Sequence, residues 1–100
     1  MKLSVLERIQ LLGILPKEGD FSTLKIVRGL QNDLGFSEEE LKETELVLKD
    51  NHYGWKKEVE KDVQIGDKGT DIIKDSLKKL SEQKKLSIQM MDLYEKFVKE

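Results

Sequence analysis

The sequence predicts a helix-dominant α+β protein with three N-terminal helices, a central β-hairpin and a C-terminal antiparallel pair of helices. Apolar residues recur at helical spacing over residues 3–34 and again from residue 67 onward. Capping residues separate the helical segments, and residues 45–65 place β-forming residues around a turn-rich stretch. A chain of 100 residues is therefore expected to form a single globular domain over residues 1–100.

The first two helices have recognisable boundaries. The first is expected over residues 3–13, with Ser4 as its cap. The second is expected to begin after Asp20 or Ser22, either of which can accept a hydrogen bond from the first turn. Gly35 follows the last apolar residue of this segment, which predicts a left-handed glycine at its end.

The third helix is short but well initiated. Ser37 and Glu40 have the spacing of a capping box, in which each side chain bonds to the backbone of the other. Glutamates at 38–40 lie in the first turn, where the helix dipole favours negative charge. The helix is expected to end near Glu43 or Thr44.

The second half of the chain is predicted to form a hairpin followed by two helices. The hairpin is placed around residues 51–54, with a longer second arm or a third short strand after it. Helical spacing returns at Asp67 or Thr70, and Ser87 is expected to cap the last helix. The short connection between these two helices predicts that they pack antiparallel.

Composition excludes several classes of protein. The chain has no cysteine, which rules out disulfides, thiolate metal sites and cysteine nucleophiles and fits a reducing compartment. No apolar run approaches the ~18 residues of a membrane span. Glu7 and Arg8 interrupt the N-terminal apolar segment, so it does not follow the signal-peptide pattern. We expect a cytoplasmic protein that does not associate with membranes, in a host cell's cytoplasm if it is phage-encoded.

The sequence offers little for catalysis. The single histidine, His52, falls in the predicted hairpin turn, where a general base would lack an oriented partner and a pocket. Gly66 and Gly69 are explained by a turn that starts a helix, and no phosphate-binding motif surrounds them. The acids between residues 62 and 71 miss the spacing of a calcium loop. We therefore expect no enzymatic activity, no metal and no cofactor.

Two closely joined helices before a hairpin also suggest a winged helix-turn-helix, so DNA binding is the alternative function. The third helix would place its glutamates against phosphates, and arginine, which reads bases with a bidentate fork, occurs twice against sixteen lysines. Nucleic-acid binding is thus disfavoured, and a small-ligand-binding oligomer is the other alternative. The residues that would contact DNA are Lys25 and Arg28 on the second helix and Lys56 and Lys57 on the wing.

The preferred hypothesis is non-catalytic binding of a protein partner, with self-association as a homodimer. Aromatic residues near a hairpin tip supply large, rigid contact area, although Trp55 would also suit the core. The identity of the partner is not encoded in any motif. The candidate partner-binding residues are His52, Tyr53 and Trp55 at the tip and Glu38, Glu39 and Glu43 on the acidic face of the third helix.

Three stretches, LLGILPKEGDFSTLKIVRGL, GFSEEELK and LYEKFVKE, together resemble a group of small proteins encoded by phages and prophages. The group has no established activity and no diagnostic catalytic motif. The resemblance implies a short accessory protein made in a bacterial cytoplasm that acts by binding. It assigns no functional residue.

Overall fold

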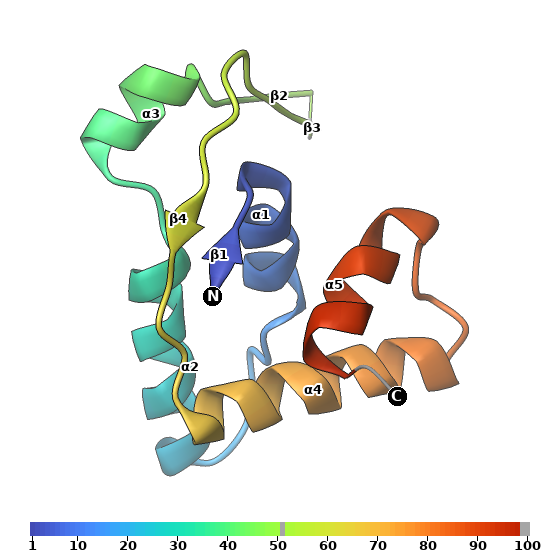
Figure 1. Cartoon of the computed structure of the whole chain (residues 1–100). Helices are drawn as coiled ribbons and strands as arrows, with labels where there is room; N and C mark the ends of the chain where they lie inside the picture. The colour runs from blue at the N-terminus through green and yellow to red at the C-terminus, as the bar shows by residue number, and fades with distance from the viewer. Residues whose placement is uncertain (51, 99–100) are drawn as a thin grey trace.

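The computed structural model describes residues 1–50 and 52–98 and confirms a helix-dominant α+β fold (Figure 1). The predicted hairpin turn at Asn51 lies outside the described residues. In chain order the elements are β1 (Lys2–Leu3), α1 (Val5–Ile14), α2 (Phe21–Leu34), α3 (Glu38–Thr44), β2 (Val47–Lys49), β3 (His52–Gly54), β4 (Lys61–Asp62), α4 (Asp67–Glu82), the 3-10 turn η1 (Ile88–Met90) and α5 (Met91–Phe97).

Side-chain caps begin the first three helices as the sequence predicts. The hydroxyl of Ser4 accepts a hydrogen bond from the Glu7 N–H at 3.2 Å, and the Glu7 carboxylate accepts one from the Ser4 N–H at 3.0 Å. Asp20 caps α2. Ser37 and Glu40 form the predicted capping box, with both bonds at 3.1 Å. These local bonds satisfy backbone N–H groups that have no partner within the helix.

The predicted left-handed stop at Gly35 is wrong. Gly35 ends α2 with φ −64° and an extended backbone, while its N–H bonds to the carbonyl of Gln31 at 2.9 Å. A Cβ at this position would lie 3.0 Å from the Gln31 oxygen. Glycine is therefore needed here for a close approach and not for a positive φ.

The predicted cap at Ser87 is confirmed in its position but not in a side-chain bond. Within the described residues the Ser87 side chain makes no capping hydrogen bond, and η1 separates Ser87 from α5, which begins at Met91. The backbone of Ser87 is extended and its carbonyl accepts the Met90 N–H at 3.0 Å, the shorter interval typical of a 3-10 turn.

The strands form two separate antiparallel pairs among the described residues, β1 with β4 and β2 with β3. The predicted third strand exists as β4, but it pairs with the N-terminal strand and not with the hairpin. Backbone bonds between Met1 and Val63, and the terminal amine on the Asp62 carboxylate at 2.8 Å, fix this pairing. His52–Gly54, expected in the turn, form strand β3.

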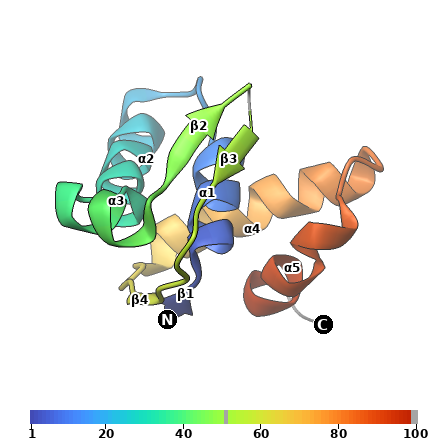
Figure 2. The same ribbon diagram turned by 90° about the horizontal axis from the view of Figure 1, so that it is seen from above.

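The core lies where four helices meet. In both views α1 lies between α2 and α5, and α4 crosses beneath them (Figures 1 and 2). The chain folds back after α4 so that α5 packs against it, which is the predicted C-terminal helix pair. The buried apolar side chains are Leu3, Val5, Leu11, Leu15, Val27, Leu30, Leu34, Val63, Ile73, Leu77, Leu93, Phe97 and Val98.

Candidate protein-binding surface at the hairpin

The hairpin of β2 and β3 lies at one end of the molecule, over α1 and next to α3 (Figures 1 and 2). In the described part of the chain its two strands pair only with each other. Three large apolar side chains on it are exposed, Val47 by 57%, Leu48 by 61% and Tyr53 by 52%. A two-stranded hairpin is marginally stable alone, and an exposed apolar pair such as Leu48 and Tyr53, which face each other across the strands, is typical of interaction surfaces.

An apolar cavity of about 210 Å³ lies between this hairpin and α1, and we call it the hairpin groove. Leu48 and Tyr53 are paired in the strand register, and Leu46 lies two residues before Leu48 and thus on the same face. The volume is below the roughly 300–1,000 Å³ of small-molecule sites and suits one large side chain. The groove is lined by Ile9, Leu12, Gly13, Phe36, Leu46 and Tyr53.

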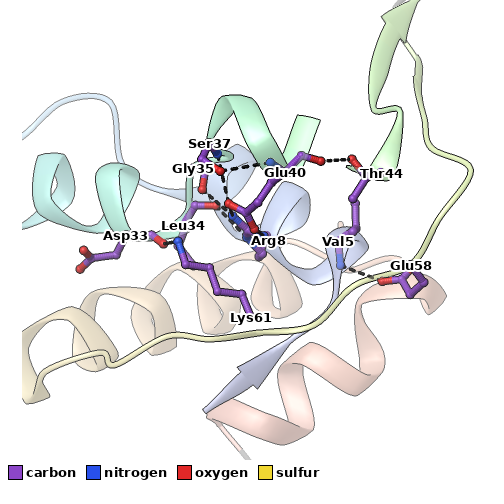
Figure 3. A network of polar contacts seen from close by, with 10 residues as sticks. All are labelled: Val5, Arg8, Asp33, Leu34, Gly35, Ser37, Glu40, Thr44, Glu58 and Lys61. Carbon is purple, nitrogen blue, oxygen red and sulfur yellow. Dashed lines mark hydrogen bonds and ion pairs between the residues drawn. The ribbon is translucent and has the colours of Figure 1, made fainter. Parts of the chain in front are cut away.

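Trp55 does not belong to the exposed tip where the sequence placed it. It follows β3, is half-buried, and its Nε1–H donates to the Glu58 carboxylate at 2.9 Å. The other oxygen of Glu58 accepts the Val5 N–H at 2.9 Å, as Figure 3 shows. One carboxylate therefore ties the outgoing arm of the hairpin to the start of α1. His52 and Tyr53 lie exposed on β3, as expected.

The base of the hairpin is joined to α3 through Thr44. Thr44 is buried, and its backbone carbonyl accepts hydrogen bonds from the N–H groups of Lys56 and Lys57 at 2.8 and 3.3 Å. Its hydroxyl donates to the Glu40 carbonyl at 2.7 Å (Figure 3). Because these bonds fix the hairpin at the end of α3, the acidic helix and the apolar hairpin belong to one end of the molecule.

The lysines of the predicted wing face acids. Lys56 Nζ lies 3.7 Å from a Glu45 oxygen, and Lys57 Nζ lies 3.6 Å from a Glu43 oxygen. All four side chains are largely exposed, so each pair contributes little to stability. The pairs nevertheless offset the positive charge that a DNA-reading wing would need.

The remaining candidates occupy separate helices. Glu38 and Glu39 are exposed in the first turn of α3, as predicted. Lys25 and Arg28 are exposed on α2, so the four DNA-contacting candidates are divided between α2 and the segment after β3. Glu40, the third glutamate of the run, points inward.

Arg8 forms the most connected polar network near the groove, and sequence reasoning missed it (Figure 3). Its side chain is fully buried, and Nε donates to the Leu34 carbonyl at 3.0 Å. Nη1 and Nη2 bond to the Glu40 carboxylate at 2.6 and 3.1 Å, and Nη2 also donates to the Gly35 carbonyl. Cζ lies 3.9 Å from the centroid of the Phe36 ring. The network therefore holds Phe36, one wall of the hairpin groove, against α1.

The ion pair between Arg8 and Glu40 lowers the pKa of the Glu40 carboxyl. Hydrogen bonds from Arg8 are the main reason that the pKa of the Glu40 carboxyl falls to about 2. Glu40 is thus ionised at neutral pH and does not have the raised pKa of a general acid. The sequence signal was available, because Arg8 lies three residues from Val5 and from Leu11 on the apolar stripe of the helix.

A larger cavity of about 680 Å³ lies between α1 and α5 and bears on the ligand-binding alternative. Most of its lining residues are charged or carry amides. Lys96 Nζ pairs with Glu7 at 2.7 Å, and the Gln10 amide donates to the Gln89 carbonyl at 3.3 Å. Glu7, Lys96 and Gln10 are thus bonded within the chain, and no feature of the cavity selects a particular ligand.

The other observations do not add a chemical site. Within residues 1–50 and 52–98, no group of three or more His, Cys, Asp or Glu side chains could hold a metal ion. None of the described helices is both long and apolar enough to cross a membrane. No family model matches this chain, and neither a curated protein nor a solved structure matches it. Function is therefore inferred from the molecule itself.

Proposed function

We propose that this chain is a non-catalytic accessory protein of phage or prophage type that binds a protein partner at the hairpin groove. The observation that carries the proposal is an apolar cavity of side-chain size beneath a hairpin with exposed Leu48 and Tyr53. Apolar side chains that a partner covers contribute strongly to binding when they surround a pocket that an anchor residue fills.

The partner supplies one large apolar side chain to the groove. Tyr53 and Leu48 pack beside this anchor, and His52 lies at the polar rim. Glu38 and Glu39 at the neighbouring end of α3 favour a partner with a basic flank, because charge complementarity accelerates association and selects partners. The Arg8 and Glu58 networks position the two walls of the groove before the partner arrives, which lowers the cost of ordering them.

A substitution that fills the groove with one of the protein's own side chains tests the proposal. Gly13 is exposed on α1 and lines the groove, and a Cβ added there meets nothing within 4 Å. Gly13→Leu therefore fills the groove without removing a core contact, and leucine also favours the helix more than glycine does. We expect the variant to keep its circular dichroism and to lose partners captured from a bacterial lysate by crosslinking and mass spectrometry.

The matched control is Gly29→Leu. Gly29 is also an exposed helical glycine whose added Cβ meets nothing within 4 Å, but it lies on α2 and does not line the groove. This variant should capture partners as the parent protein does. Equal capture by the Gly13→Leu protein would show that the groove is not the binding site.

A further inference from the structure

The apolar side chain of Ile88 is exposed to solvent. It opens η1 between α4 and α5, and 84% of it is exposed. Met91, one turn further on, is 49% exposed. In both views the connection from α4 to α5 lies on the opposite side of α1 from α2 (Figures 1 and 2). The chain thus carries an exposed apolar side chain of the size that its own groove accommodates.

The charges around the two features are complementary. Residues 78–88 contain four lysines against one acid, whereas Glu38 and Glu39 lie exposed in the first turn of α3 and form no ion pair with a described residue. Lys84 and Lys85 are exposed, and neither forms an ion pair with any described residue. The positive segment that leads to Ile88 therefore matches the acidic first turn of α3, which follows the groove residue Phe36.

We propose that the hairpin groove is occupied by Ile88 of a second copy of this chain, which makes the protein a homodimer. This inference rests on the proposed function of the groove. Each copy has one groove and one Ile88, and the proposed dimer places them about a two-fold axis, so that both contacts form at once and no further copy is added.

Charge selects Ile88 over Phe21, the next most exposed large apolar side chain among the described residues. Phe21 is 81% exposed at the start of α2, at a different place in the fold. Its neighbours in sequence, Lys17, Glu18, Asp20 and Lys25, carry balanced charge. Phe21 therefore offers no electrostatic match to the groove and provides the control position.

The test is the dimerisation constant of the purified full chain, measured by sedimentation equilibrium over a series of concentrations. Gly13→Leu fills the groove and Ile88→Asp places a charge where an apolar side chain is needed. Each should weaken dimerisation about tenfold or more, as expected for a central interface residue. Gly29→Leu and Phe21→Asp should leave it unchanged. Raising the salt concentration should weaken the dimer of the parent protein.

Mixing the two weakened variants tests reciprocity. The Gly13→Leu chain keeps its Ile88 and the Ile88→Asp chain keeps its groove, so a mixed pair retains one of the two contacts. Differently tagged copies of the two variants should form a heterodimer more tightly than either variant pairs with itself. A mixture that associates no better than the separate variants would overturn the reciprocal arrangement.

The remaining outcomes separate the inference from the proposed function. A parent protein that stays monomeric, or a dimer that ignores Ile88→Asp, overturns the inference. In that case the Gly13→Leu protein can still fail to capture, from the lysate, a partner that the parent protein captures. The groove then binds that partner, and the proposed function stands. If Gly13→Leu changes neither dimerisation nor capture, both fail.

Discussion

Arg8 illustrates at the scale of one residue how a buried charge becomes acceptable. Removing a guanidinium from water is costly unless its donors find partners. Here the donors reach the carbonyls of Leu34 and Gly35 and both oxygens of Glu40. Among the described residues, no buried side-chain nitrogen or oxygen lacks a hydrogen-bond partner. The same side chain thereby joins α1 to the end of α2 and the beginning of α3.

Replacing Arg8 by Met should cost about 3 kcal/mol of the free energy of unfolding, because the Glu40 carboxylate and two carbonyls lose their partner. The lower end of the usual range applies, since 20% of the Glu40 side chain is exposed to water. Urea denaturation measures the loss. Arg8→Lys keeps the charge but not the bidentate fork and should recover only part of it. A loss below about 1 kcal/mol in the Met variant would contradict this account.

At the scale of the element, the hairpin depends on Glu58 for its attachment. The carboxylate accepts from the Trp55 indole with one oxygen and from the Val5 N–H with the other. No neighbouring strand supports the hairpin within the described residues, so side-chain bonds of this kind determine how it is oriented. The orientation in turn sets the width of the hairpin groove.

Glu58→Ala should therefore loosen the hairpin while the helices remain folded. Loss of two hydrogen bonds to a charged group predicts a decrease of about 1–3 kcal/mol in stability. Trp55 fluorescence should shift to longer wavelength, and amide exchange should accelerate in β2 and β3 more than in α4. Glu60→Ala is the control, because Glu60 is exposed and makes no hydrogen bond to a described residue. Unchanged Trp55 emission in the Glu58→Ala protein would show that Glu58 does not attach the hairpin.

Elements differed in how well the sequence predicted them, for a physical reason. The caps at Ser4, Asp20 and Ser37 were predictable because they involve residues three positions apart. The pairing of β1 with β4 joins residues about sixty positions apart, and no local pattern encodes it. Among the described residues a left-handed backbone occurs at Glu45, Asp50 and Lys84 and not at the expected Gly35, so the position of glycine did not predict where the chain adopts this conformation.

At the scale of the whole molecule, the candidate site could be predicted only in part. The exposure of Tyr53 followed from its place beside a turn-rich stretch. The groove did not, because its walls come from α1, from Phe36 before α3 and from the hairpin, which the fold brings together. Trp55 was expected at the tip, but its bond to Glu58 draws it toward α1. A site assembled from distant segments has no signature in any one of them.

The packing of α2 on α4 supports the last prediction, which compares two glycines in helices. Gly69 is buried in the first turn of α4, and a Cβ there would lie 3.0 Å from Leu30 Cδ2 and 3.1 Å from Ile65 Cγ2. Gly69→Leu must therefore push α4 away from α2 and should cost about 1–3 kcal/mol in urea denaturation. Gly13→Leu, whose added Cβ meets nothing within 4 Å, should keep stability or raise it by about 0.5–1 kcal/mol. Because α4 also contacts α1 and α5, the Gly69 variant should lose protection from amide exchange in all these helices at once. Equal stability of the two variants would mean that the α2–α4 contact does not depend on the missing side chain.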